Sequence, residues 1–243
     1  MSVDANRSVV ARKRSRARTE ALAERDPRAK LQYFPTPPWA TRAFLDAAEI
    51  DLRGKLVWEP FCGCGHMAAV LEEAGAHVYA SDIYPHGYGA VGSFVGGDLV
   101  GDVIRRPWPG RGDWVISNPA FTLMVQAFER GLDVADNVAM FCRLQWLETP
   151  ERYHLFARHR FEVWVHTDRV PLHEFEWLPD GSTATAYAWF VLRRDRPQWS
   201  ATAEFDGRFV PPGGRERFTR PDDAYWFAGD PPRILDRRAE GRK

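Results

Sequence analysis

The sequence predicts an α/β fold in which a mainly parallel sheet carries helices on both faces. Short apolar runs alternate with stretches whose apolar residues recur at helical spacing, and such alternation implies right-handed crossovers between parallel strands. The apolar runs at 56–59 and 114–117 are each followed by a tight loop. In open α/β sheets, ligands bind where buried parallel strands end. The two loops therefore mark the expected functional edge of the sheet.

A proline-rich segment precedes the first helix. Pro35, Pro37 and Pro38 fix φ and bias the residues before them away from helical conformations, which predicts a stiff extended stretch. Residues 39–48 then carry apolar side chains at helical spacing and are expected to form a helix. A short connection through Gly54 leads into the first strand.

The remaining elements follow in alternation. Apolar runs predict strands, and apolar residues at three- and four-residue spacing predict helices. We expect strands at 56–59, 77–81, 114–117, 137–144, 161–167 and 185–192, and helices at 66–74, 121–132 and 150–159. The turn residues between Pro179 and Ser182 predict a loop before the last of these strands.

Charge is unevenly distributed, although the formal net charge is zero. Residues 1–30 contain nine basic and four acidic side chains, whereas residues 31–192 contain 12 basic and 20 acidic ones. We therefore expect a flexible basic arm over 1–30, one domain over 31–195, and an extension rich in proline and arginine over 196–243. The run from Arg12 to Arg18 is dense enough to contact phosphates, and a solvated tail explains it equally well.

Composition excludes several classes of protein. The 243 residues, 44% of them hydrophobic, suffice for one soluble domain with a sizeable core, and no apolar run approaches the ~20 residues of a membrane helix. The first eight residues lack the apolar segment of a secretory signal. Only Cys62, Cys64 and Cys142 are present, so we expect a cytoplasmic location, no disulfide and, without a second Cys/His pair, no metal site.

The loop after the first strand has the features of a ligand-binding turn. Gly63 and Gly65 permit positive φ and a close approach of a ligand to the backbone, and the next helix presents unpaired N–H groups. The third glycine of a dinucleotide fingerprint and the lysine of a P-loop are absent, which disfavours nucleotide triphosphate hydrolysis. Asp82 ends the next strand about twenty residues on, where a carboxylate can accept both ribose hydroxyls of a nucleoside.

The second tight loop contains Asn118-Pro119-Ala120-Phe121. With the loop from Glu59 to Gly65 upstream, this motif makes the chain resemble, over roughly residues 31 to 195, the amino-group methyltransferases that use S-adenosylmethionine. The resemblance implies a Rossmann-like methyltransferase fold with a mainly parallel seven-stranded sheet. The motif order is of the gamma type, and the segments 141–148 and 182–189 are similar to those of small phage and prophage DNA adenine N6-methyltransferases.

The resemblance assigns a cofactor site to the first loop and its surroundings. It places Glu59 near the methionine part of S-adenosylmethionine and makes Asp82 the ribose acceptor. The contact to the cofactor's adenine is expected from Asp98, with Asp102 as the alternative, because the glycine-rich stretch around them leaves the register open. The expected cofactor-binding residues are Phe34, Thr36, Pro37, Glu59, Gly63, Gly65, Asp82 and Asp98.

In this family the second loop serves methyl transfer to an exocyclic amine. Such an amine is a poor nucleophile because its lone pair is delocalised into the ring, and two acceptors aimed at its hydrogens favour a pyramidal nitrogen. The side-chain oxygen of Asn118 and the backbone carbonyl of Pro119 are the expected acceptors, and Phe121 is expected to stack on the base. The family usually has a second proline where this chain has Ala120, but both acceptors remain.

Substrate contacts are expected at the same edge of the sheet. Arg143 and Gln145 leave the strand at 137–144, and Trp146 beside them is expected in the core. Arg169 lies before a loop, and Ser182 lies within it. This loop is expected to form part of the wall around the target base; the alternative is that it is an ordinary solvated loop.

These observations favour a DNA methyltransferase that transfers a methyl group from S-adenosylmethionine to adenine N6 of a flipped-out base. The small size of the chain predicts short or relaxed sequence specificity. The alternatives are RNA adenine N6 or cytosine N4 methylation, methylation of glutamine in a protein, and a non-catalytic relative that binds nucleic acid. We expect DNA as the partner, no membrane association, and a monomer or weak dimer.

Overall fold

The structure is a computed structural model that describes residues 26–92, 110–197 and 202–240. The chain separates into two compact units, Met1–Tyr33 and Phe34–Lys243. In the described part of the first unit, the 3-10 helix η1 (Pro27–Leu31) begins after Asp26, whose carboxylate accepts a hydrogen bond from the backbone N–H of Arg28 at 2.9 Å. Within the described residues, no helix combines the length and the apolar character needed to cross a lipid bilayer.

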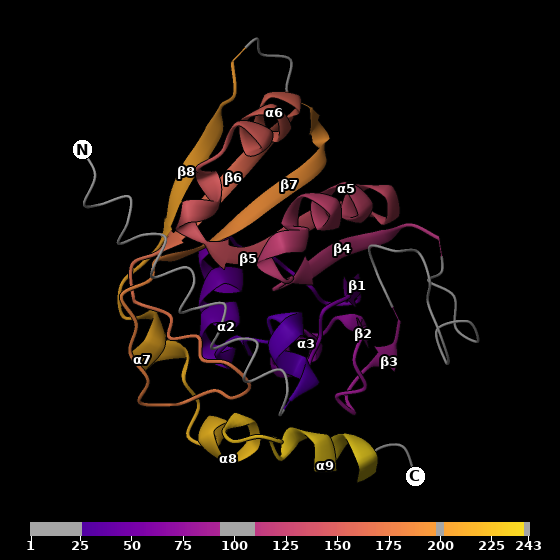
Figure 1. The fold of residues 1–243 in the computed structure, drawn as a ribbon, viewed down its shortest axis with the longest axis vertical. Helices are drawn as coiled ribbons and strands as arrows, with labels where there is room; N and C mark the ends of the chain where they lie inside the picture. The colour runs from indigo at the N-terminus through magenta and orange to yellow at the C-terminus, as the bar shows by residue number, and fades with distance from the viewer. Residues whose placement is uncertain (1–25, 93–109, 198–201, 241–243) are drawn as a thin grey trace. The chain divides into compact units, whose positions relative to one another are not determined.

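One mixed sheet organises the second unit (Figure 1). Its strands are β1 Leu56–Glu59, β2 His77–Asp82, β3 Ala90–Val91, β4 Gly112–Ser117, β5 Ala135–Arg143, β6 His159–His166, β7 Tyr187–Pro197 and β8 Phe205–Val210. In the described chain they lie in the order β3-β2-β1-β4-β5-β7-β6-β8. Most neighbouring strands run parallel, whereas β7 runs antiparallel to both β5 and β6.

This arrangement confirms the predicted Rossmann-like methyltransferase fold. The strand order changes direction between β1 and β4, which are neighbours although β2 and β3 come between them in the chain. At such a switch point the loops after the two strands diverge and leave a crevice in which ligands bind. Within the described residues the sheet has one strand more than the seven expected, because β8 pairs with the outer side of β6.

Helices cover both faces of this sheet (Figure 1). The longer ones are α2 Pro38–Ala47, α3 His66–Glu73, α5 Met124–Val134 and α6 Pro150–Arg158, and short 3-10 helices follow β4 (η2, Phe121–Leu123) and β5 (η3, Leu144–Leu147). Successive residues of the central strands enter opposite cores: Val57 packs on the α2 and α3 side, and Trp58 on the α5 and α6 side. In β7, Trp189 likewise packs on the α2 and α3 side and Phe190 on the α5 and α6 side. Burial on both faces explains why these strands are continuous apolar runs.

The chain ends in the short helices α7 Gly214–Phe218, α8 Asp223–Phe227 and α9 Ile234–Glu240. Helices α8 and α9 run beyond α3 and the β2–β3 end of the sheet (Figure 1). Arg42 of α2 holds α8 in place, because its guanidinium contacts Asp223 Oδ2 at 2.7 Å and Glu73 Oε2 at 3.1 Å. Asp223 is buried, so loss of Arg42 would leave a buried carboxylate without its charged partner, with only the backbone N–H of Arg220 still donating to it.

Candidate functional site

The glycine loop joins the end of β1 to the start of α3. Gly63 and Gly65 have φ of 51° and 86°, so both occupy the left-handed region that favours glycine. A Cβ added to Gly65 would lie 2.1 Å from the ring of Tyr88. The group in close contact with the Gly65 backbone is therefore the ring of Tyr88, whereas the sequence suggested that a ligand would lie there.

Asp82 at the end of β2 shapes this loop. Its Oδ2 accepts a hydrogen bond from the backbone N–H of Gly63 at 2.8 Å, and its Oδ1 accepts one from the N–H of Tyr84 at 3.0 Å. Burial raises the pKa of Asp82, while these hydrogen bonds and the nearby His86 act in the opposite direction. The carboxylate thus ties the glycine loop to the next strand.

Glu59 presents an unsatisfied oxygen at the end of β1. The residue is 2% exposed, and within the described structure its Oε2 is buried without a hydrogen-bond partner. Burial, and then the charge of Asp82, raise the pKa of Glu59 well above its usual range. A buried carboxyl oxygen without a donor is costly, which marks a position where a ligand donor or cation is favoured.

Asn118 follows β4 and is held by its amide nitrogen. Nδ2 donates to the carbonyl of Phe34 at 2.9 Å and to Thr36 Oγ1 at 3.1 Å. A carbonyl can only accept, so the contact to Phe34 sets which way the amide faces. Among the described residues nothing bonds Asn118 Oδ1, which is buried. The proline-rich segment and the Asn-Pro loop therefore meet here, an arrangement that the sequence did not predict, with the amide oxygen unbonded among the described residues.

Two further unsatisfied atoms lie at this edge, and sequence reasoning missed both. Ser117 Oγ and His66 Nδ1 are buried without a partner in the described structure. Nε2 of His66 lies 2.8 Å from the carbonyl of Phe227, so Nε2 carries the proton and Nδ1 is an acceptor. Burial lowers the pKa of His66 to about 4. The only sequence signal for His66 is its position directly after Gly65.

The remaining predicted residues occupy varied positions. Phe121 stacks on Phe34 with 5.8 Å between ring centroids, and Pro37 precedes the first residue of α2. Pro119 is buried, and so is Trp146, at 3% exposure in the core beside α5 and α6.

Other predicted contacts are exposed or lie beyond the described residues. Arg143, Gln145, Arg169 and Ser182 are exposed. Of these, Arg143 contacts Phe121. Asp98 and Asp102 lie outside the described residues. In residues 26–92, 110–197 and 202–240, no group of three or more His, Cys, Asp or Glu residues is placed to hold a metal ion.

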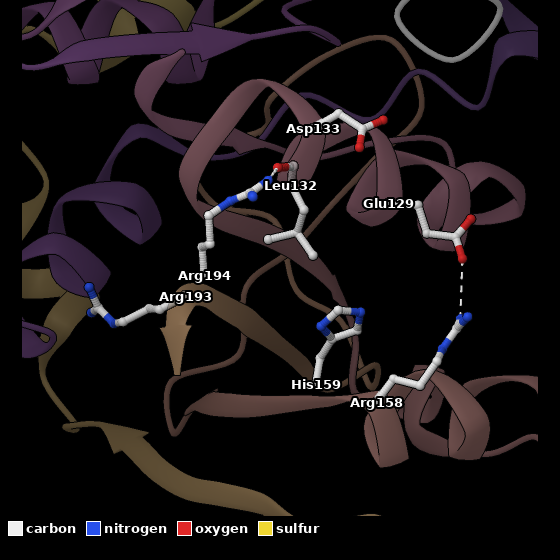
Figure 2. A pocket seen from close by; sticks show the side chains of 7 residues that line it. All are labelled: Glu129, Leu132, Asp133, Arg158, His159, Arg193 and Arg194. Atoms are coloured by element: carbon white, nitrogen blue, oxygen red, sulfur yellow. Dashed lines mark hydrogen bonds and ion pairs between the residues drawn. The ribbon is translucent and has the colours of Figure 1, made fainter. Parts of the chain in front are cut away.

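A hollow of about 420 Å³ lies at the opposite edge of the sheet, where α5 ends and β6 begins (Figure 2). Its charged groups already pair with protein atoms: Arg158 contacts Glu129 at 3.2 Å, and Arg194 donates to the carbonyl of Leu132. Burial, and then the charge of Arg158, lower the pKa of His159. The hollow contains none of the predicted site residues and is lined by Glu129, Leu132, Asp133, Arg158, His159, Arg193 and Arg194.

No protein-family model and no curated protein sequence matches the chain. Several solved structures are similar to it. A proposed RNA methyltransferase from Pyrococcus horikoshii is 14% identical with a TM-score of 0.47, over 67% of this chain and 88% of that one. The modification subunit of a proposed type I restriction enzyme from Vibrio vulnificus YJ016 is 13% identical with a TM-score of 0.48, over 87% of this chain and 56% of that one.

A third similar structure is magnesium protoporphyrin IX methyltransferase from Synechocystis PCC 6803, determined with bound S-adenosylmethionine. It is 18% identical with a TM-score of 0.38, over 64% of this chain and 77% of that one. Because identities and TM-scores are low, the roles of individual residues rest on the geometry of this chain.

Proposed function

We propose that this chain transfers the methyl group of S-adenosylmethionine to N6 of adenine in DNA. The observation that carries this proposal is the state of Asn118, whose amide nitrogen is tied to Phe34 and Thr36 while its oxygen is buried and unbonded among the described residues. An oxygen held in this way can accept a hydrogen bond from an incoming amine without reorganisation.

The residues around the glycine loop fit S-adenosylmethionine. Glu59 Oε2 lacks a donor in the described structure, and the raised pKa of this carboxyl falls when a cation lies beside it. The amino acid part of S-adenosylmethionine carries an ammonium group, which suits an oxygen that the protein leaves unsatisfied. When bound, the cofactor supplies an electrophilic methyl group on a sulfonium. Asp82 is the proposed ribose acceptor, and it also keeps the loop in shape.

Positioning and electrostatics supply most of the proposed catalysis. Asn118 Oδ1 and the Pro119 carbonyl accept hydrogen bonds from the two amine hydrogens, while Phe121 stacks on the base. Held in this way, the amine nitrogen would direct its lone pair at the methyl group of the bound cofactor, and the proton that it loses on methylation would pass to water.

The substrate class is tested by incubating the protein with tritiated S-adenosylmethionine and, separately, duplex DNA, single-stranded DNA, RNA and protein extract. The modified product is then identified by mass spectrometry. The basic arm favours nucleic acid, so we expect N6-methyladenine in DNA. Label in RNA, in N4-methylcytosine or in glutamine would assign the corresponding alternative, and the absence of calorimetric cofactor binding would favour a non-catalytic relative.

Asn118→Ala tests the central residue. We expect turnover to fall on the order of a hundredfold or more, with cofactor affinity retained in calorimetry, because one preorganised acceptor is lost. Asn137→Ala is the matched control, since Asn137 is an asparagine at the other end of the strands whose Nδ2 donates to the Asp113 carbonyl at 3.0 Å. Near-normal turnover in Asn118→Ala would remove Asn118 from the proposed role.

A further inference from the structure

A continuous set of contacts frames Asn118. Tyr187 on β7 lies opposite Arg143 on β5; burial raises the pKa of its phenol, and the nearby Arg143 guanidinium acts in the opposite direction. The guanidinium carbon of Arg143 lies 4.5 Å from the centroid of the Phe121 ring. That ring stacks on Phe34 with 29° between the planes, and the carbonyl of Phe34 accepts the hydrogen bond from Asn118 Nδ2.

Tyr187 and Phe121, which lie on either side of Arg143 in this frame, differ in how firmly they are held. Tyr187 is 4% exposed and stacks on Phe141 with 5.4 Å between centroids, so it belongs to the rigid core of the sheet. Phe121 instead begins a three-residue 3-10 helix and is half-buried. Such a short helix has few backbone hydrogen bonds of its own, so the orientation of the ring depends on the groups that contact it.

We propose that Arg143 is a positioning residue: its guanidinium, placed beside Tyr187 by the β5–β7 pairing, sets the plane of the Phe121 ring that packs against the target base. This inference rests on the proposed function and adds a residue that acts through another one. A planar guanidinium can lie flat on an aromatic face, a geometry that a lysine ammonium does not reproduce. The competing role for an exposed arginine beside a nucleic-acid site is direct contact with a phosphate.

The test uses Arg143→Ala, Arg143→Lys, Phe121→Leu and the double variant Arg143→Ala/Phe121→Leu in the full chain. Methyl transfer to DNA is measured over a series of salt concentrations, so that kcat, KM and the salt slope of DNA binding are obtained for each. Arg158→Ala is the matched control, because Arg158 is an exposed arginine that pairs with Glu129 at the opposite edge of the sheet (Figure 2).

For a positioning role, we expect kcat of Arg143→Ala to fall on the order of tenfold while KM for DNA changes by less than about twofold. The double variant should be no slower than Phe121→Leu alone, because both changes remove one function. Lysine should not restore kcat, and the salt slope should match that of the wild type. If Arg143 instead anchors a phosphate, the losses of Arg143→Ala and Phe121→Leu should multiply in the double variant, and Arg143→Lys should restore activity. The slope of the logarithm of DNA affinity against the logarithm of salt concentration should then be lower by about 0.9.

A separate readout keeps the inference independent of the proposed activity. If the wild type methylates none of the substrates offered, the proposed function fails, and the frame is then tested by urea unfolding of the same variants. Non-additive shifts of the unfolding midpoint for Arg143→Ala and Phe121→Leu would support the contact between these side chains as an orienting one. Additive shifts would overturn the proposal.

Discussion

Asp82 has a structural task that accompanies its proposed contact with the cofactor. Its Oδ2 accepts a hydrogen bond from the Gly63 N–H and its Oδ1 one from the Tyr84 N–H, and the Ile83 backbone and His86 also act on it. A carboxylate offers about four acceptor positions, so this carboxylate retains capacity for a ribose hydroxyl. Loss of the side chain would therefore affect both the ligand and the loop that receives it.

We expect Asp82→Ala to weaken binding of S-adenosylmethionine by roughly 1.5–3 kcal/mol, the scale of a hydrogen bond to a charged group. The free energy of unfolding should also fall, by about 1–3 kcal/mol, because the Gly63 N–H loses its acceptor. Calorimetry and urea unfolding measure the two effects, and kcat at saturating cofactor should change less. Asp51→Ala, at an exposed carboxylate paired with Arg53, serves as control. An unchanged cofactor affinity would show that the ribose assignment is wrong.

Ala120 already has a backbone conformation close to that of proline. Its φ is −51°, within the range that a proline ring adopts. We expect Ala120→Pro to raise the free energy of unfolding by about 0.4–1 kcal/mol through lower entropy of the unfolded chain, with methyl transfer retained. Thermal or urea unfolding and the tritium assay test this together. A proline variant that binds cofactor but transfers no methyl would require a different geometry for the amine acceptors.

Only part of the site could be predicted from local sequence. Glu59, Asp82 and Asn118 each follow or end an apolar run, so their meeting at one edge follows from the topology of parallel strands. The unsatisfied state of His66 Nδ1 and the packing of Tyr88 on Gly65 depend on residues far apart in the chain. No local pattern encodes such an arrangement.

At the scale of elements, periodicity located the central strands and helices to within a few residues. The helix expected at 66–74 is α3, and the strand expected at 137–144 is β5. The helix expected at 121–132 begins as the 3-10 helix η2 and continues as α5, because the chain leaves the Asn-Pro loop in an extended conformation at Ala120.

The elements absent from the sequence prediction are those that depend on tertiary contacts. Strand β8 contains Gly207 between charged residues and lies at the sheet edge, where Val210 alone among its residues is buried, so burial imposes no alternating apolar pattern. Helices α7 to α9 have five to seven residues each. Helices this short are not stable on propensity alone, so packing such as the Arg42–Asp223 contact must hold them.

The basic arm is the element that we expect to contribute affinity for DNA. Deletion of residues 1–28 should leave cofactor binding intact, weaken DNA binding and flatten its salt dependence, because each lost phosphate contact lowers the logarithmic slope by about 0.9. Binding titrations at several salt concentrations give this slope. Equal slopes for the full and shortened chains would identify the arm as a solvated tail.

At the scale of the whole molecule, two buried histidines make stability depend on pH. Burial lowers the pKa of His66 and of His166 to about 4 from an ordinary value of 6.5. The unfolded chain therefore binds more protons between these values, and the free energy of unfolding falls as pH drops through this window. Each histidine contributes about 2 kcal/mol of this loss at pH 5 relative to neutral pH. The raised pKa of Glu59 acts in the opposite direction, so the contribution of Glu59 to the free energy of unfolding falls as pH rises.

His66→Gln isolates one of these contributions. Glutamine retains a donor for the Phe227 carbonyl but does not titrate, so the loss of stability between pH 7 and pH 5 should be smaller by about 2 kcal/mol than in the wild type. Urea unfolding at both pH values measures the difference. Identical pH dependence in the two proteins would contradict a buried neutral His66 in the folded state.

The antiparallel pairing of β7 with β6 gives the chain a natural place to grow. Because Val165 lies opposite Ala188, the two ends of the segment 167–186 are held side by side by the sheet itself. The entropy of closing a loop rises only with the logarithm of its length, so doubling this segment costs about 0.6 kcal/mol. Under the proposed function, a DNA-reading module inserted at the exposed Asp180 would leave the strand register untouched. A small domain of this kind can therefore acquire new sequence specificity by addition, without redesign of the fold that carries its chemistry.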